Sequence, residues 1–221
     1  MNTPTTSASG KTDAQRPLPV LGDASPEIAL PAPSRAASMS LTTALAARRS
    51  ERGFAGTPLP LQALSDLLWA ANGINRPGGG RTAPSAHDER EVAIYVALPQ
   101  GAYRFDPVDH LLRLVAVGDV RRVTGYQDFV DHAPLDLVFV HDAQPQSAIE
   151  AAQRTPFAFA AAGAIAQNVY LSCAAQGLAC ALRGSMDRDA IARALGLTHN
   201  QHVLLAQTVG FPLVDPVEIG L

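Results

Sequence analysis

The chain has 221 residues, of which 47% are hydrophobic and 17% are charged, and its formal net charge is −3. This composition supports one domain with a sizeable hydrophobic core. The slightly acidic balance gives no reason to expect nucleic acid or an anionic membrane surface as the main partner.

The two cysteines, Cys173 and Cys180, match neither a zinc site nor a redox pair in their spacing. We therefore expect two buried thiols in a reducing compartment. No run reaches the roughly 18 apolar residues that cross a bilayer. Together these features predict a soluble, cytoplasmic protein.

Residues 1–38 are rich in Ser, Thr, Pro and Ala and lack hydrophobic periodicity. Such a segment cannot bury enough apolar surface to order itself. It also lacks the apolar core of a secretory signal. The sequence therefore predicts a flexible N-terminal arm over residues 1–38, followed by one domain over residues 39–221.

Helical periodicity predicts a first helix from Ser40, as N-cap, to Arg49. A second helix begins after Pro60, and Asn72-Gly73 supplies residues that tolerate a left-handed C-terminal cap. An Ala-rich stretch over residues 146–176 is apolar nearly all round in its second half. That pattern predicts a helix buried on all sides, for which a subunit interface is the natural place.

Short apolar runs predict the strands, and the first two are joined by a tight turn at Pro99-Gln100-Gly101. A last helix over residues 187–195 is stopped by Gly196. Strands mixed with helices and joined by a hairpin indicate an α+β fold. The glycines at 78–80 follow a helix rather than a strand, so the dinucleotide-binding fingerprint is absent. The predicted strands cover residues 91–98, 102–105, 111–117, 135–140, 178–182 and 203–210.

Three arginines and a serine lie together in Arg48-Arg49-Ser50-Glu51-Arg52. A guanidinium group is a planar fork that can bind two phosphate oxygens at once, so this cluster suits a phosphorylated cofactor. The alternative is a solvated basic helix end favoured by the helix dipole. A twin-arginine export signal is disfavoured, because an amphipathic stretch follows rather than an apolar one.

The order of these motifs resembles the FMN-dependent nitroreductase family from about Ser40 to Pro212. The resemblance rests on Arg-Arg-Ser-x-Arg after a first helix, on the leucine-rich second helix ending in Trp-Ala-Ala-Asn-Gly, and on Pro84-Ser85-Ala86 before a strand. The strand Tyr-Arg-Phe-Asp at 103–106 is similar to the branch of azoline and thiazoline dehydrogenases. The resemblance implies an interlocked α+β homodimer, with a central mixed sheet flanked by helices and two FMN molecules at the interface.

The resemblance also assigns roles to individual residues. The arginine cluster would hold the ribityl phosphate and the pyrimidine edge, the Pro-Ser loop would lie against the isoalloxazine, and two main-chain N–H groups would approach flavin N5. No catalytic side chain is needed because the flavin carries the chemistry, and Arg52 and Gly184 would tune it. The implied cofactor-binding residues are Arg48, Arg49, Ser50, Arg52, Pro84, Ser85, Arg183 and Gly184, with no metal ligand among them.

The resemblance therefore favours an oxidoreductase that passes electrons from NADH or NADPH through FMN to a nitroaromatic, a quinone or a similar electron-poor small molecule. One alternative is an FMN-dependent dehydrogenase that oxidises an azoline-like heterocycle. Another is a non-catalytic protein that sequesters flavin. This second alternative arises because no basic residue follows Gly210, where family members often complete the phosphate site.

Overall fold

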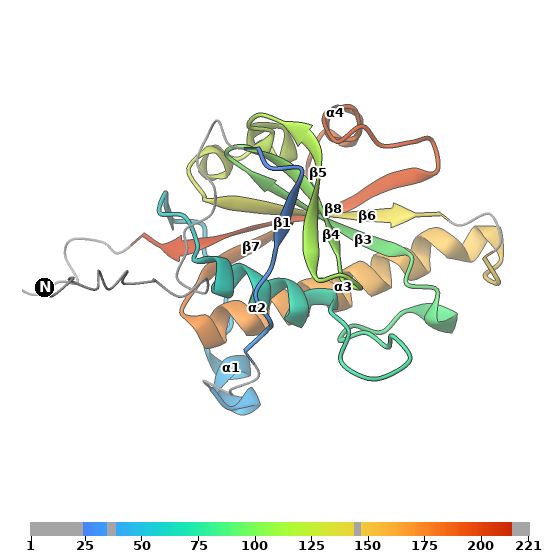
Figure 1. The fold of residues 1–221 in the computed structure, drawn as a ribbon, viewed down its shortest axis with the longest axis horizontal. Helices are drawn as coiled ribbons and strands as arrows, with labels where there is room; N and C mark the ends of the chain where they lie inside the picture. Colours follow the sequence, from blue (N-terminus) through green and yellow to red (C-terminus); the bar gives the residue numbers. More distant parts are fainter. Residues whose placement is uncertain (1–23, 35–38, 144–146, 214–221) are drawn as a thin grey trace, which may run out of the picture.

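A computed structural model describes residues 24–34, 39–143 and 147–213. Its centre is an eight-stranded sheet with the order β1-β5-β4-β3-β6-β8-β2, in which β7 also pairs with β8 (Figure 1). The strands are β1 (Glu27–Ala29), β2 (Phe54–Ala55), β3 (Val92–Leu98), β4 (Gly101–Asp106), β5 (Leu111–Val117), β6 (Leu135–Asp142), β7 (Ala179–Arg183) and β8 (Gln201–Pro212).

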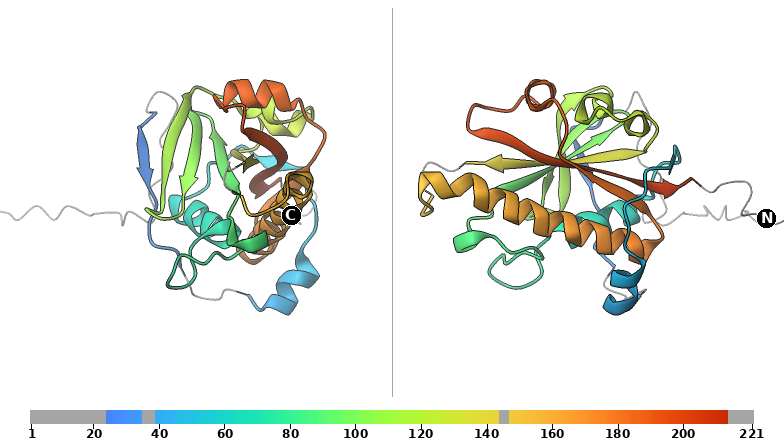
Figure 2. Two further views of the ribbon diagram at one scale, coloured as in Figure 1. Left: turned by 90° about the vertical axis from the view of Figure 1, so that its right-hand side faces the viewer. Right: turned by 180° about the vertical axis from the view of Figure 1, so that it is seen from behind.

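Helices cover both faces of this sheet, which confirms the predicted α+β class (Figures 1 and 2). Helices α2 and α3 lie on one face, and α4 lies on the other. Every strand pair among the described residues is antiparallel, so the expectation of a mixed sheet is corrected for this chain. The helices are α1 (Leu41–Ala47), α2 (Leu61–Asn72), α3 (Ala151–Gln176) and α4 (Arg188–Ala194), with short 3-10 helices η2 (Ala86–Asp88), η3 (Arg121–Thr124) and η4 (Asp128–Asp131).

Strand alternation divides the interior into two cores, because successive side chains point to opposite faces. In β3, Ile94 and Val96 join the larger core under α2 and α3, whereas Tyr95 joins the core under α4. Strand β6 is buried along seven of its eight residues, as its apolar run predicts for a central strand.

Several local predictions are confirmed. Ser40 caps α1 by accepting a hydrogen bond from the Thr43 backbone N–H. The hairpin of β3 and β4 closes at Leu98 opposite Gly101. Gly196 follows α4 with a φ of 63°, the left-handed region that a glycine adopts readily. Both cysteines are buried free thiols.

The predicted N-terminal arm is wrong for residues 24–34. Glu27–Ala29 forms β1, which pairs with β5 at the sheet edge and places Ile28 opposite Leu112. Ile28 and Leu30 are buried in the larger core, and this burial offsets the cost of ordering the segment. The remainder of the predicted arm, residues 1–23 and 35–38, lies outside the described residues.

Gly73 corrects a second expectation. Its φ of −75° and ψ of 168° are extended, so α2 does not end in a left-handed cap. A Cβ atom at this position would lie 2.5 Å from the Trp69 ring. Glycine is therefore required here for space rather than for conformation.

Within one chain, helix α3 buries one side, and the predicted burial of its other side against a second subunit stays a prediction. Phe157 and Phe159 are each 39% exposed, and Ala160 and Gly163 are exposed beside them. Among the described helices, α3 is long and apolar enough to cross a membrane by length and composition alone. A stretch of that length and hydropathy was not expected from the sequence. Its inner face packs against α2 and the sheet, as in the core helix of a globular domain.

The buried carboxyl group of Glu91 predicts a pH-dependent stability. Neither of its oxygens has a hydrogen-bond partner among the described residues. Burial, with a smaller contribution from the charge of Glu89, raises the pKa of Glu91. A raised folded-state pKa means that stability is greatest below the unfolded value of about 4.3 and falls as the pH rises through the folded value.

The substitution Glu91→Gln removes this charge. We expect its melting temperature to exceed that of the wild type by about 2–4 °C at neutral pH, equivalent to about 1 kcal/mol for a chain of this size. The difference should shrink toward pH 4. Melting curves over that range check it, and a difference that grows on acidification would contradict the assignment.

Candidate functional site

The arginine segment, residues 48–52, leaves the C-terminus of α1 as extended chain. The Arg48 backbone N–H closes the last helical hydrogen bond to the Ala44 carbonyl. The Glu51 N–H then donates to the Cys180 carbonyl of β7 at 2.9 Å. The backbone of the segment is thus fixed at both ends, although Arg49, Ser50 and Arg52 are exposed.

Tyr170 of α3 holds this segment against β7. Its hydroxyl oxygen lies 2.7 Å from the Ser50 hydroxyl and accepts a hydrogen bond from the Leu182 backbone N–H at 2.9 Å. The Arg48 guanidinium lies 5.2 Å from the centroid of the Tyr170 ring, within cation–π range. Sequence reasoning missed Tyr170. Its signal is a hydroxyl group within the apolar second half of α3.

A cavity of about 320 Å³ opens beside the segment. Arg49 lies on its wall and forms an ion pair with Glu51. The Arg49 side chain is 77% exposed, so its guanidinium can reorient toward an anion at little cost. The remaining walls come from α1, the C-terminal half of α3, and the strands beside it, namely Ala47, Tyr170, Cys173, Ala174, Gly177, Leu178, Cys180 and Pro212.

Pro84 and Ser85 lie in a separate loop, residues 84–90. The Ser85 hydroxyl accepts a hydrogen bond from the Arg90 backbone N–H at 3.0 Å. His87, Asp88 and Arg90 have φ values of 53°, 56° and 56°. Non-glycine residues rarely adopt this left-handed conformation, which costs free energy and concentrates at binding sites.

Glu89 ties this loop to the start of α3. Its carboxylate accepts hydrogen bonds from the Ser147 hydroxyl at 2.6 and 2.7 Å and from the Ile149 N–H at 3.3 Å. The hydrogen bond from Ser147 is the main cause that lowers the pKa of Glu89. The loop is therefore anchored at the N-terminal end of α3.

One chain does not bring the two groups of predicted site residues together. The loop is anchored at Ile149, whereas the arginine segment is held at Tyr170. An α-helix rises about 1.5 Å per residue, so these anchors are about 30 Å apart. Figure 2 shows α1 and the loop preceding β3 at opposite ends of α3.

Arg183 ends β7, and Gly184 follows it. The preceding residue, Leu182, donates its N–H to the same Tyr170 hydroxyl that contacts Ser50, so this end of β7 lies near the arginine segment. The Arg183 side chain is committed elsewhere. It forms a buried ion pair with Asp136 at 2.5 Å and donates to the Thr124 carbonyl at 2.6 Å. Burial raises the pKa of Asp136 to about 6, against the opposing attraction of Arg183.

Gly184 is exposed, and a Cβ atom there would make only an ordinary 3.7 Å contact with Leu205. Arg183 as a whole is buried, so of these two residues only Gly184 is exposed. The role that the sequence suggested for their N–H groups stays a prediction.

The comparisons with known proteins identify the family. The nitroreductase family model matches residues 45–211. The chain belongs to the nitroreductase family. It is similar to a crystal structure of a candidate nitroreductase from Ralstonia eutropha JMP134, with 46% identity, a TM-score of 0.84, and coverage of 90% of this chain and 96% of that one.

Two further relatives are more distant. A candidate nitroreductase from Methanocaldococcus jannaschii is 28% identical over 182 residues, covering 78% of this chain and 91% of that protein. The NADPH:FMN oxidoreductase from Vibrio harveyi, solved in complex with NAD+, is 21% identical with a TM-score of 0.59, covering 80% of this chain and 70% of that one. At that identity the likeness shows a shared fold alone.

The position of Tyr170 predicts the effect of removing its hydroxyl group. Tyr170→Phe keeps the ring beneath Arg48 but leaves the Leu182 N–H without this acceptor, which costs about 1–3 kcal/mol of unfolding free energy. Denaturant unfolding measures the loss. Tyr126→Phe is the control, because Tyr126 is 63% exposed and should change stability by less than about 0.5 kcal/mol. Equal losses in both variants would refute the bridging role.

Proposed function

We propose that this protein is an FMN-dependent oxidoreductase that passes electrons from NADH or NADPH to a nitroaromatic, a quinone or a similar electron-poor small molecule. The observation that carries the proposal is the arginine segment, which Tyr170 and β7 fix beside a cavity in a member of the nitroreductase family. The charge and the donor geometry of this segment fit the phosphate of FMN.

The proposed site residues divide into three groups. Arg48, Arg49 and Ser50 bind the phosphate, and Arg52 lies toward the pyrimidine edge. When bound, FMN supplies the capacity to accept and return two electrons. The positive charge of Arg52 stabilises the negative charge that accumulates on that edge in the reduced state. The main-chain N–H groups of Arg183 and Gly184 orient the reactive part of the ring.

The third group, Pro84 and Ser85, requires a second copy of the chain. Because α3 holds the loop about 30 Å from the arginine segment, we propose that the loop of one protomer packs against the flavin held by its partner. The exposed face of α3 fits such a homodimer. Phe157 and Phe159 provide apolar area there, and Gly163 allows close approach of a second helix.

Stopped-flow absorbance tests the proposed activity. The purified protein with FMN is mixed with NADPH or NADH, and then with a nitroaromatic or a quinone. We expect rapid bleaching of the flavin absorbance followed by reoxidation by the acceptor. Bleaching only by a heterocyclic, azoline-like substrate would replace the proposal with the dehydrogenase alternative. Inertness toward every donor would indicate a flavin-binding protein without catalysis.

The arginine segment makes a prediction about affinity. Arg48→Ala and Arg49→Ala should each weaken FMN binding at least tenfold, because each removes a charge-assisted hydrogen bond worth about 1.5–3 kcal/mol. Fluorescence titration measures this effect. The matched control is Arg122→Ala, which removes an exposed arginine of η3 that forms an ion pair with Asp131 of η4. Unchanged affinity in the first two variants would count against the assignment.

A further inference from the structure

A second cavity, of about 180 Å³, lies where β3 and β4 separate. The two strands pair from Leu98 opposite Gly101 to Tyr95 opposite Arg104, and then diverge. From Val92 to Ile94, β3 keeps β6 on one side, while the cavity lies on its other side. We call this cavity the arginine pocket, because its lining includes Arg81, Arg90 and Arg104.

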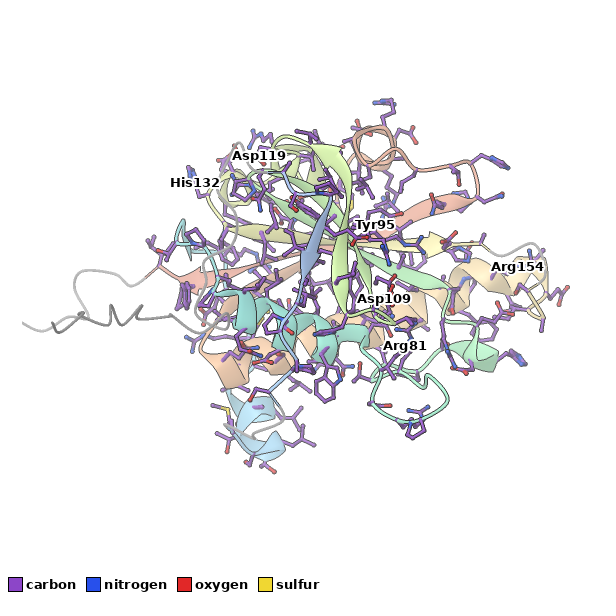
Figure 3. The ribbon with its side chains drawn as sticks, in the orientation of Figure 1. Arg81, Tyr95, Asp109, Asp119, His132 and Arg154 are labelled. Atoms are coloured by element: carbon purple, nitrogen blue, oxygen red, sulfur yellow. The ribbon has the colours of Figure 1, made fainter. Side chains whose placement is uncertain are left out.

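The three arginines of the pocket come from separate elements. Arg81 lies in the loop between α2 and η2, and Figure 3 labels its side chain. Arg90 ends the loop after η2, and Arg104 belongs to β4. Burial lowers the pKa of Arg81, and the positive charge of Arg90 lowers it further. The charges of Asp106 and Asp88 oppose this lowering, and the lining of the pocket also includes Glu89 and Asp142.

The carboxylates around the pocket are all engaged, two of them by the pocket arginines Arg90 and Arg104. Asp88 accepts two hydrogen bonds from Arg90, and Asp142 accepts one from Arg104 at 3.1 Å. Glu89 is bound by Ser147 and Ile149, as described above. Asp106 accepts from Arg113 and from two backbone N–H groups, those of Val108 and Asp109.

Arg81 is left with unused binding capacity. It has no ion-pair partner among the described residues, and its buried Nε has no hydrogen-bond acceptor there. Its side chain makes one hydrogen bond among the described residues, a long one of 3.3 Å from Nη1 to the Asn72 carbonyl. A buried donor without an acceptor costs free energy, which an anion in the pocket would recover.

We propose that the arginine pocket binds the oxyanion group, phosphate or carboxylate, of a small molecule. The guanidinium fork of Arg81 offers the planar geometry that such a group accepts, and its charge, unlike those of Arg90 and Arg104, is not paired with a carboxylate among the described residues. The volume suits a single anionic group rather than a whole flavin, since pockets that enclose drug-sized ligands measure roughly 300–1,000 Å³. The pocket adjoins the loop carrying Ser85, whose hydroxyl binds the Arg90 backbone.

Isothermal titration with inorganic phosphate tests this proposal on the full chain loaded with FMN, with unbound FMN removed and the ionic strength held constant with sodium chloride. We expect saturable binding by the wild type and at least a tenfold loss in Arg81→Gln. Arg104 lines the same pocket, so Arg104→Gln should also weaken phosphate binding. This variant provides the test if Arg81→Gln does not fold. Arg122→Gln removes the same charge outside the pocket and should bind as the wild type does.

Succinate in place of phosphate separates the two possible anion types, and tighter binding of either one identifies the group that the pocket takes. The proposal is overturned if neither anion binds saturably below roughly 20 mM. It is also overturned if Arg122→Gln loses as much affinity as Arg81→Gln. FMN binding, read from absorbance in the same samples, reports separately on the proposed function, so that each idea can fail alone.

Discussion

Helix α3 determines how the proposed flavin site can be assembled. Tyr170, toward its C-terminus, binds Ser50 and Leu182, whereas Glu89 fixes the loop 84–90 at its N-terminus. A continuous helix is stiff and rises about 1.5 Å per residue, so one chain keeps these two groups about 30 Å apart. Each group is well anchored, and neither can move to meet the other within a protomer. The proposed site would then require two copies of the chain.

The anchoring of the arginine segment places its binding capacity where an anion can use it. Backbone hydrogen bonds and the Tyr170 hydroxyl group fix the chain, while Arg49 and Arg52 remain exposed. Fixing the backbone before binding reduces the ordering cost that a ligand must offset. The same logic applies to Arg183, whose buried ion pair with Asp136 holds the end of β7.

Local sequence patterns predicted the elements whose causes are local. Ser40 could be recognised as an N-cap, and the β3–β4 hairpin followed from its flanking turn residues. The features that were missed depend on partners distant in sequence. Ile28 belongs to a strand only because β5 lies beside it. Gly73 is a local exception, because the Trp69 ring that requires it lies one turn earlier in α2. The composition of α3 likewise does not show which of its faces meets the sheet.

The candidate site divides in the same way. The arginine cluster and the Pro84-Ser85 loop could be found as sequence motifs, whereas Tyr170 could not, because its importance lies in contacts with residues 50 and 182. The separation of the two motifs along α3 was equally invisible in the sequence. In the sequence, Arg81 is only the residue that follows the glycines at 78–80. That its buried Nε lacks a hydrogen-bond partner among the described residues depends on the three-dimensional arrangement.

Subunit complementation tests the shared site most directly. One variant carries Arg48→Ala with Arg49→Ala, the other carries Ser85→Trp, and each is chosen so that its homodimer binds no FMN under the assay conditions. If each site combines residues 48–52 of one protomer with residues 84–85 of its partner, mixed dimers contain one intact site, and co-refolding restores FMN binding. If mixed dimers form and no FMN binding returns, the site lies within single chains and the account is wrong.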